Sequence, residues 1–199
     1  MTEIKKLIEQ GKFKEAETLV VESKVSKKTE EAINCGEALL LSGYQGDASL
    51  YFMLGTCYSW IEQYDKAIEA YNQVIKLKPD YAKAHNNLGF AYYYKGEYDK
   101  AIEAFHQALE LDPDCVSAYY NLGNVYSIKE DYNKAIEAYK EAIKLRPTHA
   151  EAHHNLGNVH QINKWLKENY PNYANLSEED KRVVRRRYNE EKYEEANKS

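Results

Sequence analysis

The octapeptide YDKAIEAF at residues 98–105 has two close copies, YDKAIEAY at 64–71 and YNKAIEAY at 132–139. The copies are 34 residues apart, and the same interval separates four Leu-Gly pairs and three prolines. A fixed period of this length predicts an array of stacked units in place of one compact globule. Three full units therefore run 48–81, 82–115 and 116–149, and a fourth begins at Ala150.

Each unit has the apolar spacing of two antiparallel helices. In the second of these repeats, residues 82–115, Leu88, Gly89 and Tyr92 share one face of a first helix. Gly96 lets the chain turn, and the second helix ends before Pro113 because proline disfavours helix in its predecessor. A single hairpin cannot bury both apolar stripes, so neighbouring hairpins must stack. The sequence predicts an all-α fold, a right-handed α-solenoid of helix-turn-helix repeats.

The recurring residues resemble the tetratricopeptide repeat pattern of a large residue, a Leu-Gly pair, an Ala before an aromatic residue and a closing Pro. The matching positions are Leu54, Gly55, Ala67, Pro79, Leu88, Gly89, Ala101, Pro113, Leu122, Gly123, Ala135, Pro147, Leu156 and Gly157. The resemblance covers 48–163 and implies the tetratricopeptide fold. It departs from the family at the first large position, where Tyr51, His85, Tyr119 and His153 replace Trp.

The flanks lose the 34-residue period. Residues 1–47 are expected to form a degenerate N-terminal repeat or capping helices, with a hairpin over 1–25, a helix at 29–42 and a turn at 42–47. The fourth unit is expected to keep only its first helix, at 150–168, because Pro171 interrupts the chain where a second helix should follow. Ser177 can cap a charged C-terminal helix within 172–199.

The composition and the motifs of the sequence argue against several classes of protein. The net charge of −5 argues against binding of nucleic acid through the overall field. No apolar stretch approaches the roughly 20 residues of a membrane helix, and no signal peptide is evident, so a cytoplasmic protein without membrane contact is expected. Three scattered cysteines, and histidines at junction and packing positions, predict neither disulfides nor a metal site. Without a phosphate loop or nucleophile motif, the sequence predicts no enzyme and no cofactor.

First helices of such an array line its concave face, and the residue before each Leu-Gly pair should point into the groove. These residues are Met53, Asn87, Asn121 and Asn155. Three carboxamides one repeat apart form a ladder that can bond an extended peptide backbone, each bond contributing about 1 kcal/mol. The candidate partner-binding residues are Asn86, Asn87, Tyr94, Tyr120, Asn121, Asn124, His154, Asn155 and Asn158, with Trp60 and Phe52 as further stacking surface.

The ladder is similar to the asparagine ladder in the tetratricopeptide superhelix of O-linked N-acetylglucosamine transferases. Only the binding mode could be shared, because no transferase domain fits in this chain. Generic repeat chemistry is the alternative explanation of these asparagines.

Another use of the fold is the carboxylate clamp that binds acidic chaperone tails. This clamp needs several Lys or Arg side chains in the groove, and of the clamp residues only an Asn is present at the equivalent positions. A neutral or mixed peptide is therefore the expected ligand.

The predicted function is a scaffold or adaptor that binds a partner peptide or helix in the concave groove. One alternative is a regulatory subunit that binds nucleic acid or an acidic protein through its C-terminal helix, where Arg182, Arg185, Arg186 and Arg187 cluster. Against it, that helix offers i,i+4 partners such as Glu178 to Arg182 and Arg187 to Glu191. Another alternative is self-association through the incomplete fourth repeat, near Leu156, Val159 and Trp165.

Overall fold

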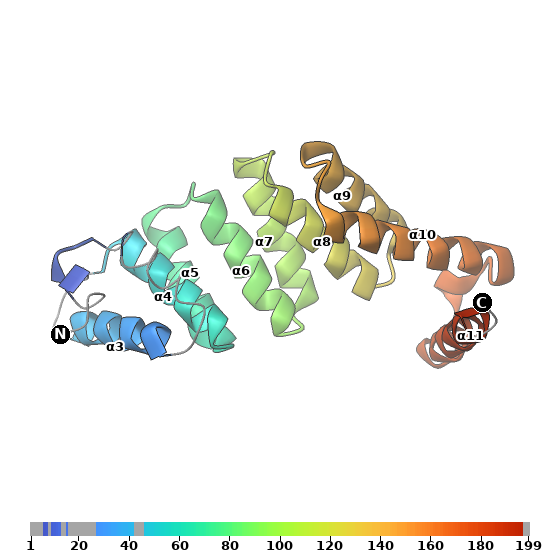
Figure 1. The fold of residues 1–199 in the computed structure, drawn as a ribbon, viewed down its shortest axis with the longest axis horizontal. Coiled ribbons are helices and arrows are strands. Elements are labelled where there is room, and N and C mark those ends of the chain that lie inside the picture. Colours follow the sequence, from blue (N-terminus) through green and yellow to red (C-terminus); the bar gives the residue numbers. More distant parts are fainter. Residues whose placement is uncertain (1–5, 8, 13–14, 16–26, 42–45, 197–199) are drawn as a thin grey trace. The chain divides into compact units, whose positions relative to one another are not determined.

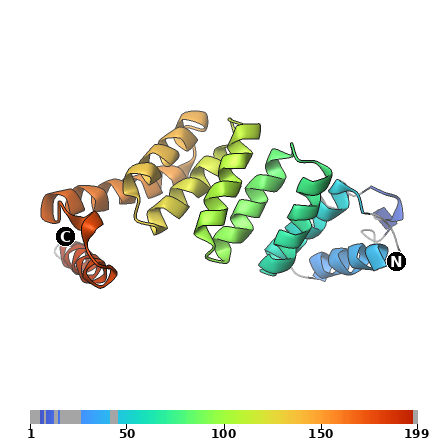
Figure 2. The same ribbon diagram turned by 180° about the vertical axis from the view of Figure 1, so that it is seen from behind.

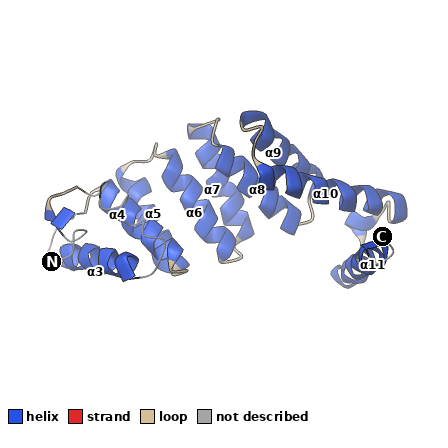
Figure 3. Ribbon diagram, viewed as in Figure 1, coloured by secondary structure: helices blue, strands red, loops and turns tan. Residues whose placement is uncertain are grey.

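The computed structural model describes residues 6–7, 9–12, 15, 27–41 and 46–196. Most of the predicted hairpin over 1–25 and most of the turn at 42–47 lie outside these residues. In the described part of the chain every regular element is a helix, which confirms the all-α fold (Figure 3). The chain forms two structural units, residues 1–121 and 122–199, and each is described by itself.

The first unit is a series of antiparallel helices that pack in chain order. It contains α3 (Lys27–Leu41), α4 (Ala48–Trp60), α5 (Tyr64–Leu77), α6 (Ala82–Tyr94), α7 (Tyr98–Leu111) and the start of α8 (Val116–Ile128). Helix α4 packs on α5, α5 on α6 and α6 on α7, while α3 packs on α4 (Figures 1 and 2). Helices α4 and α6, the first helices of two repeats, also contact each other.

Small residues allow the paired helices to approach closely. A Cβ added to Gly55 would lie 2.7 Å from the ring of Tyr71, and one added to Gly89 would lie 2.7 Å from the ring of Phe105. Both rings are almost completely buried. The Leu-Gly pair of each first helix thus receives the aromatic residue of the second helix, which closes the hairpin.

The turn inside each hairpin requires one residue with left-handed backbone geometry. Gly96 takes this place between α6 and α7 with a φ of 76°. In the repeats before and after it, the equivalent residues are Glu62 with φ 60° and Glu130 with φ 63°. A residue with a side chain is disfavoured there by roughly 1 kcal/mol. Two of the three turns therefore carry backbone strain that glycine would avoid.

Tyrosines that recur every 34 residues serve packing. A lysine ammonium lies over the ring of Tyr58, of Tyr92 and, in the second unit, of Tyr126. The partners are Lys66, Lys100 and Lys134, at 5.1, 5.4 and 5.4 Å from the ring centroids. Each pair joins the first helix of a repeat to its second helix, and such contacts contribute about 0.5–1 kcal/mol at exposed sites.

The second unit contains the rest of α8, then α9 (Tyr132–Leu145), α10 (Ala150–Asn169), the short 3₁₀ helix η1 (Tyr173–Asn175) and α11 (Glu178–Ala196). Helix α10 packs on α9 and ends just before Pro171. Ser177 caps α11, because its hydroxyl accepts the backbone N–H of Asp180 at 3.2 Å. Helix α11 lies beside the end of α10, where the Trp165 and Tyr188 rings are 5.2 Å apart.

Candidate partner-binding site

In the first unit, a buried hydroxyl joins three residues of two first helices. Tyr71 of α5 is 1% exposed, and burial raises its pKa. Its hydroxyl is within 3.5 Å of the Asn87 Nδ2 and Thr56 Oγ1 atoms and 3.4 Å from Ser59 Oγ. These hydrogen bonds are long, and one of them links the side chain of Asn87 to Tyr71.

The other end of the Asn87 carboxamide is also engaged. Its Oδ1 accepts a hydrogen bond from Asn86 Nδ2 at 3.2 Å. Asn86 Oδ1 is buried and has no hydrogen-bond partner among the residues that the structure describes. The structure therefore brings Asn86 and Asn87 together as a linked pair, with both ends of Asn87 in use.

The second unit repeats this arrangement with a different polar partner. Asn124 Oδ1 accepts hydrogen bonds from the Tyr139 hydroxyl at 2.7 Å and from Asn155 Nδ2 at 3.0 Å. The exposed Asn158 and His154 form their own pair, with Nδ2 and Nε2 3.1 Å apart. Four candidate residues of this unit thus form two hydrogen-bonded pairs on α8 and α10.

An aromatic patch of four residues, Tyr64, Phe90, Tyr93 and Tyr94, lies in the first unit. Tyr94 stacks on Tyr64 with centroids 5.3 Å apart and planes at 11°, and it lies 4.6 Å from Phe90 and 5.0 Å from Tyr93. The Tyr94 side chain is 53% exposed and that of Phe90 36%. Tyr94 is among the residues predicted from the sequence and Phe90 is not, although its place four residues earlier on the same helix was the available signal.

Two residues expected in the groove are instead in the core, so this part of the prediction is wrong. Met53 is 1% exposed and Phe52 is 9% exposed. The Phe52 ring packs 5.2 Å from Tyr81 and 5.9 Å from Tyr71. Tyr120 and Asn121, at the end of the first unit, are half-buried on α8.

Comparison with protein families identifies the repeat. Models described as tetratricopeptide repeat match residues 80–148 and 138–169, and one described as TPR repeat matches 61–95. Together these matches run without a gap from residue 61 to 169, over half of the 199 residues. The chain belongs to the tetratricopeptide repeat family. This family is generally non-enzymatic and is associated with protein-interaction scaffolds.

Solved tetratricopeptide structures share the fold. MamA is 27% identical with a TM-score of 0.65, and the alignment covers 84% of this chain and 88% of MamA. YrrB, described as a TPR protein with an unusual peptide-binding site, is 25% identical with a TM-score of 0.61 and coverages of 76% and 87%. The first TPR of Spaghetti (RPAP3), bound to an HSP90 peptide, shows likeness of fold alone at 22% identity, TM-score 0.57 and coverages of 58% and 92%. A search of curated proteins found no match.

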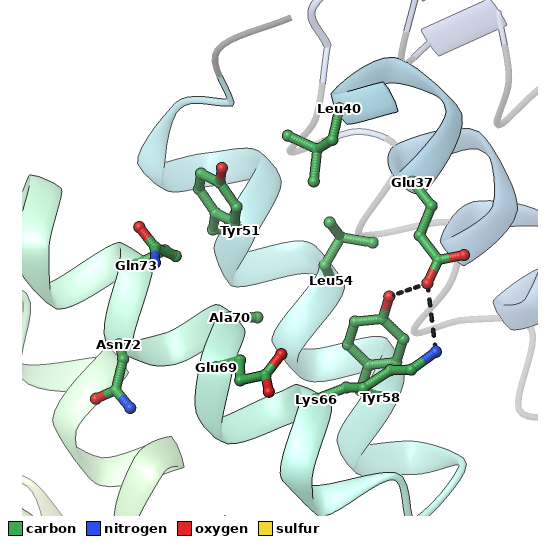
Figure 4. A pocket seen from close by; sticks show the side chains of 10 residues that line it. All are labelled: Glu37, Leu40, Tyr51, Leu54, Tyr58, Lys66, Glu69, Ala70, Asn72 and Gln73. Carbon is green, nitrogen blue, oxygen red and sulfur yellow. Dashed lines mark hydrogen bonds and ion pairs between the residues drawn. The ribbon is translucent and has the colours of Figure 1, made fainter. Parts of the chain in front are cut away.

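The tetratricopeptide chain also has a cleft of about 730 Å³ between α3, α4 and α5 (Figure 4). Its lining includes Glu37, Leu40, Tyr51, Leu54, Tyr58, Lys66, Glu69, Ala70, Asn72 and Gln73. Glu37 accepts the Tyr58 hydroxyl at 2.5 Å and lies 3.4 Å from Lys66 Nζ. Burial, with the hydrogen bond to Glu37, raises the pKa of Tyr58. The repeat pattern does not predict this cleft, because α3 lies outside the 34-residue frame.

The arginine-bearing helix α11 is tied to its own unit. Arg185 forms an ion pair with Glu130, and the Tyr173 hydroxyl donates to Glu130 at 2.8 Å. Trp165 Nε1 donates to Glu191 at 2.8 Å, and Arg187 pairs with the same carboxylate at 3.3 Å. These contacts give α11 specific attachment points in addition to its solvated face.

The ion pairs along α11 differ partly from those proposed from sequence. Arg187 and Glu191 form the expected i,i+4 pair. Glu178, however, pairs with Lys181, and Arg182 pairs with Glu179, both at i,i+3. Burial, with the nearby Glu130, raises the pKa of Tyr132 to about 12 where this region meets α9.

The histidines of the repeat junctions bond back to the preceding turn. His85 Nε2 lies 2.9 Å from the carbonyl oxygen of Pro79, and His153 Nε2 lies 2.9 Å from that of Pro147. Among the described residues, no three His, Cys, Asp or Glu side chains gather as metal ligands could. Within that same part of the chain, no helix has the length and apolar character to cross a membrane.

Proposed function

We propose that this tetratricopeptide protein is a non-enzymatic scaffold that holds an extended segment of a partner protein along the first helices of its repeats. The observation that carries the proposal is the recurrence of oriented, half-buried asparagines, Asn87 in one unit and Asn155 in the other. Because hydrogen bonds already fix these carboxamides, a partner backbone would immobilise little further side-chain freedom on binding.

The chemistry of the candidate site favours an uncharged segment. Its residues are carboxamides, aromatic rings and a histidine, and the aromatic patch adds exposed apolar area. The Spaghetti domain binds a peptide with the sequence SRMEEVD, which is rich in carboxylates. An acidic ligand needs cationic partners to offset its desolvation, and the candidate residues offer none. We therefore favour a neutral peptide, met in the cytoplasm.

The alternative partners are less well supported. Binding of nucleic acid or an acidic protein through α11 would have to compete with the contacts that Arg185 and Arg187 make to Glu130 and Glu191. Self-association through the fourth repeat would cover its apolar face near Leu156, Val159 and Trp165. Helix α11 supplies part of that cover at Trp165.

The proposal can be tested by capture of partner proteins on the immobilised full-length chain. We expect Asn87→Ala combined with Asn155→Ala to weaken binding of the captured partner about 30-fold, because two carboxamide bonds of about 1 kcal/mol each are lost. Asn72→Ala is the matched control, since Asn72 is an exposed asparagine on the α3–α5 cleft. Equal recovery with all variants would remove the asparagines from the binding surface.

A further inference from the structure

A cleft of about 450 Å³ lies at the C-terminal end of α10, within the second unit. Four parts of the chain line it: the turn between α8 and α9, the last two turns of α10, the segment around η1 and the first turn of α11. Its volume is in the range of sites that bind small molecules. None of the lining residues is among the predicted partner-binding residues, so the cleft is distinct from the candidate partner-binding site.

Three lysines from three parts of the chain line this cleft. Lys129 follows α8, Lys167 lies in the last turns of α10, and Lys181 lies in the first turn of α11. The Nζ atom of Lys167 is 3.4 Å from Asn133 Oδ1, and the half-buried Lys181 pairs with the exposed Glu178 at 2.9 Å. The fold of the second unit therefore brings three ammonium-bearing side chains to one cavity.

The two carboxylates of the lining already have cationic partners outside it. Glu130 pairs with Arg185 and accepts the Tyr173 hydroxyl at 2.8 Å. Asp131 accepts the backbone N–H of Lys134 at 3.3 Å and pairs with its ammonium group at 2.8 Å. When the ion-pair partners of the lining residues are counted, cations outnumber carboxylates around the cleft. The local field therefore favours an anionic ligand.

The uncharged part of the lining suits the organic portion of such a ligand. Leu166 and Tyr173 are buried, so they form the floor of the cleft, whereas Pro171 is exposed at its rim. Asn163 donates to Asn133 Oδ1 at 3.2 Å, and both carboxamides line the cleft. Carboxamides can donate to and accept from polar groups of a ligand. An inorganic anion would leave this apolar and carboxamide surface without a contact.

The type of cation favours phosphate over carboxylate. Lysines act as separate point charges, whereas arginine offers a planar fork that matches one carboxylate. A phosphate monoester has several terminal oxygens and about two negative charges at neutral pH, so different ammonium groups can bind different oxygens. We propose that this cleft binds a small phosphate monoester, with its phosphate held by Lys129, Lys167 and Lys181 and its apolar group on Leu166 and Tyr173.

The probe is phenyl phosphate, titrated into the full-length protein at neutral pH and followed through the side-chain amide signals in NMR spectra. We expect saturable shifts of the Asn133 and Asn163 signals, because both carboxamides line the cleft. Inorganic phosphate and benzoate should each bind at least about fivefold more weakly. The first lacks an apolar group to bury, and the second has a single charge and fewer oxygens.

Substitutions of lysine test the charged part of the site. Lys167→Gln and Lys181→Gln should each weaken phenyl phosphate binding about fivefold, because each removes one charged hydrogen-bond donor. Lys164→Gln is the matched control, since Lys164 lies on the same helix as Lys167, pairs with Glu168 at 3.9 Å and does not line the cleft. It should change the affinity less than about twofold. The amide spectra also check that each variant keeps its fold.

Three results would overturn the inference. Equal losses of affinity for Lys164→Gln and Lys167→Gln would mean that phenyl phosphate responds only to the general charge of the surface. Equal affinities for phenyl phosphate, inorganic phosphate and benzoate would exclude a site for a phosphate ester. Titration without shifts of the Asn133 and Asn163 signals would exclude this location. The proposed function is tested separately, by capture of partners that depends on Asn87 and Asn155, and none of these results would affect it.

Discussion

Replacing Gly123 by Ala should destabilise the second unit by about 2 kcal/mol, whereas the same change at Gly157 should be neutral or stabilise it by up to about 1 kcal/mol. The two glycines hold the same repeat position on first helices, so the helix propensity gained by alanine is similar at both. They differ in what an added methyl group would meet.

At Gly123 a new Cβ would lie 2.4 Å from Cε1 of Tyr139 and 2.5 Å from its Cδ1. The ring cannot move away easily, because Tyr139 is 1% exposed and its hydroxyl is bonded to Asn124 at 2.7 Å. At Gly157 nothing in the described part of the chain lies within 4 Å of a new Cβ, so no aromatic ring packs against this position.

Urea unfolding of the full-length protein, followed by far-UV circular dichroism, gives the two free energies of unfolding. Arrays of repeats can unfold in steps, so hydrogen exchange of the α9 backbone amides should be measured as a local readout. Faster exchange in α9 is expected for Gly123→Ala alone. Similar losses of stability at the two positions would show that the Tyr139 ring does not restrict this site.

The fold could be predicted from the sequence because the residues that determine it lie close together in the chain and recur in each repeat. A Leu-Gly pair, an alanine and an aromatic residue at fixed spacing recur often enough to specify a hairpin that must stack on its neighbours. Phe105 illustrates this, since its burial against Gly89 follows from the pattern alone.

The candidate site could be predicted only in part, because it depends on contacts outside the repeat pattern. Met53 has the same repeat position as Asn87 but is buried in a core that includes Ala32 and Ile33 of α3, a helix without the 34-residue frame. The engagement of Asn87 and Asn155 depends on which residues one repeat earlier carry a hydroxyl or an amide. Repeat position alone therefore predicts where the asparagines lie on the helices. It does not predict which of their side chains are hydrogen-bonded within the protein.

The attachment of α11 was beyond prediction for a related reason. Charge pairs along the helix were visible in the sequence, but Arg185 finds its partner in Glu130, which lies in the turn between α8 and α9. Glu130 stands 34 residues after Gly96, so the repeat pattern favours a glycine at position 130. At Glu130 the contacts of the side chain with Arg185 and the Tyr173 hydroxyl offset this backbone strain.

Substituting glycine for Glu130 and, separately, for Glu62 should therefore have opposite effects. Both substitutions remove strain at a positive φ, of 63° and 60°. The Glu62 side chain is exposed, so Glu62→Gly should stabilise the protein by about 0.5–1 kcal/mol. The Glu130 side chain is 13% exposed and holds Arg185 and the Tyr173 hydroxyl. Its removal should cost about 2 kcal/mol, because the Tyr173 hydroxyl and the partly exposed Arg185 lose a charged partner, for a net loss of roughly 1 kcal/mol.

Trp165 provides a local readout of this second comparison. Its indole donates to Glu191 at 2.8 Å and packs on Tyr188, so release of α11 should shift its fluorescence. Trp60→Phe removes the other tryptophan of the chain and makes the signal specific. Glu130→Gly should move the Trp165 emission to longer wavelength at lower urea concentrations than the parent, while Glu62→Gly leaves it in place. Because the two substitutions stand at equivalent positions of two different turns, a loss of stability common to both would mean that backbone geometry, and not the attachment of α11, determines the residue at this position.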